Sequence, residues 1–145
     1  MTDPARLLAA AVAARNGSYA PYSKFPVGAA LLGDDGTVWP GANVENASYG
    51  LSMCAERTAV FNAVANGRVR RFVAVAVAGP DGVTTLPCGA CRQVLFEFGP
   101  ELRVVYDDAG ELKETPIAAL LPEAFGPVHL DAAQAYAERG RGTIS

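Results

Sequence analysis

The sequence is poor in histidine, cysteine and positive charge, and it lacks a long apolar run. It has one His and three Cys among 145 residues, with a formal net charge of −3. Without a surplus of Lys and Arg, we expect no surface that neutralises nucleic-acid phosphates. The apolar runs, such as Leu7–Ala14 and Phe72–Ala78, are too short to cross a bilayer, so we expect no membrane association. No basic region leads into an apolar stretch at the N-terminus, which predicts a cytoplasmic protein without a secretion signal.

The rest of the composition is that of an ordinary globular protein. Half of the residues are hydrophobic and 19% are charged. A length of 145 residues is usual for one domain, so we expect residues 1–145 to share a single core. The three cysteines are an odd number and cannot all pair within the chain, and a protein that is not secreted keeps its thiols reduced. Metal binding is the leading explanation for them.

Helix-type and strand-type segments alternate along the chain. In order, they are a helix that starts at Thr2-Asp3-Pro4 and stops at Asn16-Gly17, strands Val27–Leu32 and Thr37–Asn43, helix Cys54–Ala65, strand Phe72–Ala78, a helix from Pro87 through Phe98, strands Leu102–Tyr106 and Glu111–Thr115, and short helices Pro116–Leu121 and Asp131–Arg139. This order predicts an α/β fold with a central five-stranded mixed sheet and helices on both faces. Crossover segments predict parallel pairing in the middle of the sheet, and the hairpins predict antiparallel neighbours.

Two short motifs place the cysteines near a glutamate: Cys54-Ala55-Glu56 and Pro87-Cys88-Gly89-Ala90-Cys91. Two cysteines separated by two residues can direct their sulfurs at one centre, and Cys54 completes a set of three thiolates. Catalytic zinc commonly takes three protein ligands and keeps a fourth position for water. Each cysteine lies at the expected start of a helix, where free N–H groups and partial positive charge stabilise thiolates. Glu56 is close enough to reach the open position without binding the metal.

Longer segments around these motifs resemble one enzyme family. Cys-x-Glu followed by Pro-Cys-x-x-Cys is the all-cysteine form of the zinc deaminase signature. The sequence is similar to the small homotetrameric cytidine deaminases from about Leu7 to Gly126. The resemblance is carried by Tyr19–Ala30, Gly41–Tyr49, Cys54–Ala59 and Leu120–Phe125. It implies the three-layer α/β/α fold of that family. It also implies hydrolytic deamination of cytidine and deoxycytidine to uridine and deoxyuridine plus ammonia, in pyrimidine salvage.

The resemblance also implies roles at the metal centre. One Zn²⁺ per subunit would be bound by Cys54, Cys88 and Cys91. It would lower the pKa of its water and so supply the hydroxide that attacks C4 of the pyrimidine. Glu56 would carry protons from that water to ring N3 and to the departing amine. Three thiolates carry more negative charge than one Zn²⁺ neutralises. Arg57 and Gln93 are therefore expected to offset this excess negative charge by hydrogen bonding to the ligands.

Further positions match the family's substrate contacts. Phe25 would pack against the pyrimidine ring, and the backbone of Ala55 would face the base. Asn43 and Glu45 would form hydrogen bonds with the ribose 3′-hydroxyl. The resemblance implies a homotetramer with shared active sites, in which neighbouring subunits contribute Ala47, Tyr49 and Phe125.

Three other interpretations stay open. A structural zinc module that binds a partner would use His129, the only histidine, as a fourth ligand. A thiol redox protein would use Cys88 and Cys91, but it leaves Cys54 and Glu56 unexplained. A deaminase of another aminated heterocycle, such as a nucleoside antibiotic, would keep the same chemistry. The run 43–46 argues for a ribose-bearing nucleoside and against that last option.

Overall fold

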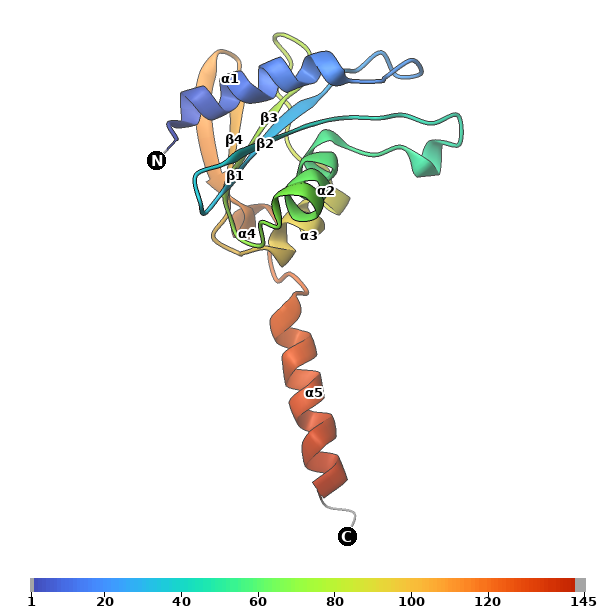
Figure 1. Ribbon diagram of the computed structural model, residues 1–145, viewed down its shortest axis with the longest axis vertical. Coiled ribbons are helices and arrows are strands. Elements are labelled where there is room, and N and C mark those ends of the chain that lie inside the picture. Colours follow the sequence, from blue (N-terminus) through green and yellow to red (C-terminus); the bar gives the residue numbers. More distant parts are fainter. Residues whose placement is uncertain (1, 143–145) are drawn as a thin grey trace.

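The chain forms a five-stranded mixed sheet with helices on both faces, and the computed structural model describes residues 2–142 (Figure 1). The helices are α1 (Pro4–Ala14), α2 (Ala55–Gly67), α3 (Gly89–Glu97), α4 (Ile117–Leu120) and α5 (Pro127–Gly142), with 3₁₀ turns at Arg15–Gly17 and Tyr49–Leu51. The strands are β1 (Gly28–Gly33), β2 (Val38–Ala42), β3 (Phe72–Ala78), β4 (Arg103–Asp108) and β5 (Glu111–Pro116). The predicted α/β fold and its order of elements are confirmed.

The strand pairing differs from the prediction at one pair. The strands lie in the order β2-β1-β3-β4-β5. Strands β3 and β4 are parallel, as the crossover through α3 predicts. Strands β1 and β3 are antiparallel, so the prediction of a parallel middle is wrong for this pair. The reason is that the β1–β2 hairpin reverses the chain. The crossover through α2 then gives β3 the direction of β2, yet β3 pairs with β1.

Alternate residues of the central strands build two hydrophobic layers. In β1, Ala29 and Leu31 pack into the cluster that contains α2, α3 and α4. Ala30 and Leu32 pack into the cluster that contains α1. The period of two follows from the geometry of an extended strand. As a result α1 covers one face of the sheet and α2, α3 and α4 cover the other (Figure 1).

Strand β2 approaches helix α2 closely at Gly41. A Cβ atom at this position would lie 2.4 Å from the carbonyl oxygen of Ala55, so no larger residue fits without a shift of the backbone. The hydroxyl of Thr58 spans the same contact and donates to the carbonyl of Ala42 at 2.8 Å. This contact fixes the segment that follows β2 beside the start of α2.

The C-terminal helix extends beyond the predicted range Asp131–Arg139 at both ends, because α5 spans Pro127–Gly142. Proline suits the first helical position, and Nδ1 of His129 accepts a hydrogen bond from the Gly126 N–H at 3.0 Å. Helix α5 projects away from the sheet and the other helices (Figure 1). Neither α5 nor any other helix within residues 2–142 has the length and apolar character needed to span a membrane.

Candidate active site

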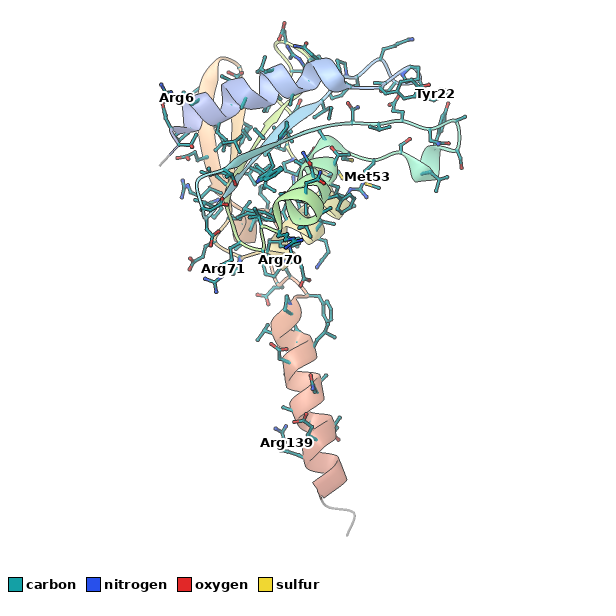
Figure 2. The ribbon with its side chains drawn as sticks, viewed as in Figure 1. Arg6, Tyr22, Met53, Arg70, Arg71 and Arg139 are labelled. Atoms are coloured by element: carbon teal, nitrogen blue, oxygen red, sulfur yellow. The ribbon has the colours of Figure 1, made fainter. Side chains whose placement is uncertain are left out.

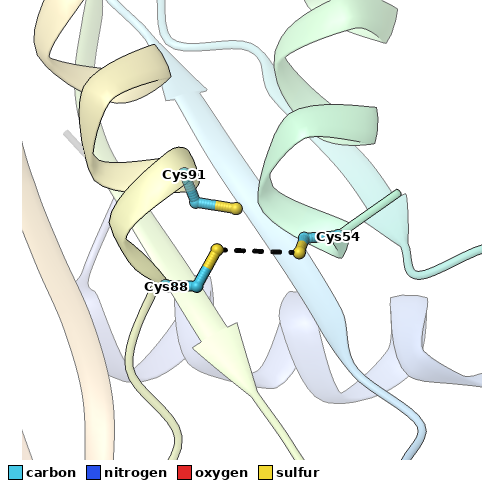
Figure 3. Close-up of side chains that lie close together, drawn as sticks. All are labelled: Cys54, Cys88 and Cys91. Carbon is cyan, nitrogen blue, oxygen red and sulfur yellow. Dashed lines mark hydrogen bonds between the residues drawn. The ribbon is translucent and has the colours of Figure 1, made fainter. Parts of the chain in front are cut away.

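Three cysteine sulfurs meet where α2 and α3 begin (Figure 3). Cys54 is the N-cap residue of α2, and Cys88 is the N-cap residue of α3. Cys91 follows in the first turn of α3 and is fully buried. The three Sγ atoms lie within 4.8 Å of one another, with 3.8 Å between those of Cys54 and Cys88. The structure therefore brings together the cysteines that the sequence spacing placed at one centre.

The sulfur geometry fits zinc. Four ligands at about 2.3 Å in a tetrahedron place two sulfurs roughly 3.8 Å apart. The Cys54–Cys88 separation of 3.8 Å has this value. Among the described residues, no His, Asp or Glu joins the three cysteines as a fourth ligand. His129 lies at the start of α5 instead, so the geometry favours a metal with one open position over a closed structural site.

Arg57 supplies positive charge to this sulfur cluster. Its Nη2 atom donates to Sγ of Cys54 at 3.3 Å, as the sequence resemblance implied. Hydrogen bonds from the Cys91 thiol and from Arg57 lower the pKa of Cys54 to about 5. The hydrogen bond between Cys91 and Cys54, together with burial, raises the pKa of Cys91. In the absence of metal, Cys91 therefore keeps its proton while Cys54 is a thiolate. The bond to Cys54 also raises the pKa of Arg57, which stays charged.

Glu56 is the one buried charged residue in the described chain, with 4% of its surface exposed. Burial raises the pKa of its carboxyl group above the ordinary value, because desolvation disfavours the charged form. The neighbouring Cys54 thiolate acts in the same direction. A carboxyl group with a raised pKa can accept and release a proton nearer neutral pH than an exposed one.

Glu56 and two of the cysteines open into one cavity of about 570 Å³. The residues predicted from sequence that line it are Phe25, Asn43, Glu45, Cys54, Ala55, Glu56 and Cys88. The remaining lining residues were not predicted from the sequence; they are Ser23, Val27, Ser52, Met53, Thr85 and Leu86. Met53 lies beside the start of α2 (Figure 2). A usable signal existed for Met53, because it directly precedes Cys54.

Asn43 and Glu45 order another part of the cavity wall through contacts with the backbone. The amide Nδ2 of Asn43 donates to the carbonyl of Phe25 at 2.9 Å. Oε1 of Glu45 accepts from the backbone N–H groups of Tyr22 and Ser23, at 3.0 and 3.1 Å. Hydrogen bonds from Ser23 lower the pKa of Glu45, so the carboxylate is ionised at neutral pH. Both side chains therefore hold the loop that presents Phe25.

Six of the predicted site residues lie outside the lining of this cavity. Cys91 and Arg57 belong to the sulfur cluster, and the other four are Ala47, Tyr49, Gln93 and Phe125. Ala47 is on an exposed loop, and Tyr49 and Phe125 are 74% and 58% exposed. The Phe125 ring stacks on His129, with 5.3 Å between ring centroids. Nε2 of Gln93 donates to the carbonyl of Phe125 at 2.9 Å, which ties this segment to α3. The role of Gln93 beside the cysteine sulfurs stays a prediction.

The chain matches a known protein family. The profile of one family, described as the cytidine and deoxycytidylate deaminase zinc-binding region, matches residues 1–107. The chain belongs to this family. It is 50% identical over 125 residues to a cytidine deaminase from Sporosarcina psychrophila, across 85% of this chain and 91% of that protein.

Solved structures of family members agree with the fold. The crystal structure of cytidine deaminase from Burkholderia pseudomallei has a TM-score of 0.79 and 53% identity, across 86% of this chain and all of that one. The crystal structure of cytidine deaminase from Mycobacterium tuberculosis has a TM-score of 0.78 and 44% identity, across 87% of this chain and 99% of that one. The five-stranded mixed sheet is thus the fold of this deaminase family, and zinc is its metal.

Arg57→Ala tests the charge balance of the deaminase site. The substitution removes the hydrogen bond to Cys54 but none of the three sulfurs, so we expect zinc content to persist and kcat to fall by about 10-fold to 100-fold. Steady-state kinetics and metal analysis of the same preparation measure both quantities. Arg6→Ala is the control, because Arg6 is exposed on α1 and lies outside the cavity, and its zinc content and kcat should equal those of the parent. Unchanged turnover in Arg57→Ala would contradict the assigned role.

Proposed function

We propose that this chain hydrolyses the exocyclic amine of cytidine and deoxycytidine, forming uridine or deoxyuridine and ammonia. The observation that carries the proposal is the position of Glu56, a buried carboxyl group that shares one cavity with the three-cysteine cluster. Relatives at about half identity over most of the chain are cytidine deaminases. The cavity of about 570 Å³ is of the size that small-molecule sites have.

In this proposal the zinc ion is held by Cys54, Cys88 and Cys91. When bound, zinc acidifies water at its open fourth position toward neutral pH. Cys54 has a low pKa before any metal binds, so its thiolate is ready as a ligand. Arg57 offsets part of the negative charge that three thiolates bring.

Glu56 would move the protons of the reaction. Its carboxylate would take one proton from the attacking water and deliver it to N3 of the pyrimidine as the water oxygen bonds to C4. It would then take the second proton from that oxygen and give it to the amino nitrogen, so that the C4–N bond breaks, a carbonyl forms at C4 and ammonia leaves. Burial supports this role in two ways. It brings the pKa of the carboxyl group closer to neutrality, and it limits competing exchange with bulk water. Glu56 is the second residue of α2, so it lies close to Cys54, the N-cap residue of that helix.

The part of the cavity wall that contains Phe25, Asn43 and Glu45 would bind the nucleoside. Phe25 lies on the loop that Asn43 and Glu45 hold, and it offers an apolar ring for the pyrimidine. The remaining acceptor capacity of Glu45 and the second amide proton of Asn43 suit a ribose hydroxyl. The backbone of Ala55, at the start of α2, would face the base.

A homotetramer with shared sites belongs to the same proposal. Tyr49 and Phe125 are large, exposed and outside the cavity of their own chain, which is expected of side chains that cover a neighbour's substrate. Ala47 lies on the same exposed loop as Tyr49. Size-exclusion chromatography with light scattering tests the assembly directly. A fully active monomer would contradict it.

We also propose a cytoplasmic location and a role in pyrimidine salvage. All three cysteines are free thiols, and a reducing compartment keeps them available for metal. Conversion of cytidine to uridine would return the pyrimidine of cytidine to the uridine pool of the cell. Fractionation of the source cells with a specific antibody tests the location.

The test of the function is turnover of purified, zinc-loaded protein with cytidine. Loss of cytidine absorbance, with chromatographic detection of uridine and assay of ammonia, is the expected result. Deoxycytidine, cytosine and an aminated nucleoside antibiotic are run in parallel. Turnover of another aminated heterocycle, with neither cytidine nor deoxycytidine consumed, would overturn the substrate assignment while keeping the reaction class.

A further inference from the structure

The segment 79–87, which joins β3 to α3, supplies one side of the cavity. Thr85 and Leu86 line the cavity, and Cys88 follows directly as the N-cap residue of α3. The position of this segment therefore bears on the shape of the cavity and on the sulfur cluster. The contacts that hold it come from parts of the chain that the proposed mechanism does not use.

Arg15, in the 3₁₀ turn after α1, holds the beginning of this segment. Its Nη1 atom donates to the carbonyl of Gly79 at 2.6 Å and to Oδ1 of Asp81 at 3.0 Å. The Arg15 side chain is 18% exposed, whereas that of Asp81 is 93% exposed. An ion pair with so exposed a partner contributes little, so the bond to the Gly79 carbonyl is the important one. Arg15 does not line the cavity that contains Glu56.

Tight packing connects Gly79 to the cavity wall. A Cβ atom at Gly79 would lie 2.0 Å from Oγ1 of Thr85, so the two ends of the turn are in direct contact. The turn is closed by Val83 N–H donating to the Pro80 carbonyl at 3.0 Å. Oγ1 of Thr85 donates to the carbonyl of Val83 at 3.0 Å. Because Gly79 and Thr85 are in contact, we expect a shift of Gly79 to alter the position of Thr85.

The metal ligand at the end of the segment has a separate anchor. Pro87 is fully buried, and Nε of Arg92 donates to its carbonyl at 2.7 Å. Cys88 can thus keep its place when the turn before Thr85 shifts. Disturbing Gly79 is expected to change the cavity wall more than the sulfur cluster.

We propose that Arg15 is a positioning residue for the substrate cavity: by fixing the Gly79 carbonyl it sets the place of Thr85 and Leu86, and so the affinity for the nucleoside. This proposal rests on the proposed function, because it assigns the cavity to a nucleoside. Arg15 acts through Gly79 and Thr85 and does not touch the substrate.

Arg15→Met tests it, since Met keeps an unbranched stem and removes the donor. We expect KM for cytidine to rise about 5-fold to 10-fold, with kcat and zinc content within about 2-fold of the parent. Arg15→Lys keeps a cationic donor for the Gly79 carbonyl, and its KM should lie within about 2-fold of the parent. Asp81→Ala removes the ion pair alone, and it should behave as the parent does.

The outcomes separate the two proposals. If the parent turns over cytidine and Arg15→Met has the parent's KM, even with a lowered Tm, the residue is structural and the inference is overturned. If Asp81→Ala raises KM as much as Arg15→Met, the inference is also overturned. Gly79→Ala covers the case in which Arg15→Met does not fold. It displaces Thr85 with Arg15 present, and an unchanged KM would overturn the inference. A parent without turnover of cytidine or deoxycytidine counts against the proposed function instead.

Discussion

Glu56→Gln is expected to lower kcat for cytidine by about 10³-fold to 10⁴-fold, with zinc content unchanged. Gln has the shape of Glu but cannot accept the proton of water or pass it to N3. Because Glu56 is buried, solvent has little access to replace it as a proton carrier. Single-turnover and steady-state assays on the zinc-loaded variant measure the loss.

Glu97→Gln is the matched control, because Glu97 is an exposed residue at the end of α3, outside the cavity. Its kcat should equal that of the parent. A Glu56→Gln variant that retains more than about a tenth of parental kcat would exclude the proton-transfer role. Loss of zinc from that variant would instead assign Glu56 to metal binding.

Cys88→Ala is expected to remove zinc and, with it, all measurable turnover. Cys88 is an exposed N-cap residue that makes no capping hydrogen bond, so its replacement should leave the fold intact while two sulfurs stay. A site that keeps two of its three protein ligands binds zinc far more weakly. Metal analysis after dialysis against a mild chelator measures zinc per chain, and circular dichroism checks the fold.

His129→Ala is the control that separates the two kinds of zinc site. It should keep full zinc occupancy, because His129 lies at the start of α5 and is not part of the cysteine cluster. Zinc loss from His129→Ala would support a closed site with four protein ligands. Full zinc occupancy in Cys88→Ala would contradict the assignment of Cys88 as a zinc ligand.

Most of the fold was predictable because local signals and burial patterns agree. Asp3 and Pro4 mark the start of α1, and the side chain of Asp3 accepts from a backbone N–H of the first turn, as a capping residue does. The uninterrupted apolar run 72–78 became the central strand β3. The neighbour of β3 was not predictable in the same way, because pairing with β1 depends on which sheet edge the α2 crossover reaches. That the whole chain is one domain stays a prediction.

The candidate site was predictable where it consists of motifs and unpredictable where it consists of contacts. The sulfur cluster was predicted from the spacing of Cys88 and Cys91 and from the position of Cys54. Leu86 has no chemical signature, and its place in the cavity wall depends on the turn that precedes it. Arg15 lies 64 positions from Gly79 in sequence, and an isolated Arg at a helix end gives no sign of a contact at that distance.

Asn43 and Glu45 hold the loop that carries Phe25 and are also the proposed contacts of the ribose, and this combination affects attempts to redesign substrate preference. Each side chain already satisfies backbone groups of the loop that carries Phe25, so a mutant library at these two positions would mix altered recognition with a collapsed loop. Thr85 and Leu86 also line the cavity, and no hydrogen bond among the described residues joins them to that loop. Randomising the latter pair should yield more functional clones per screened variant, and it offers the better starting point for accepting modified pyrimidines.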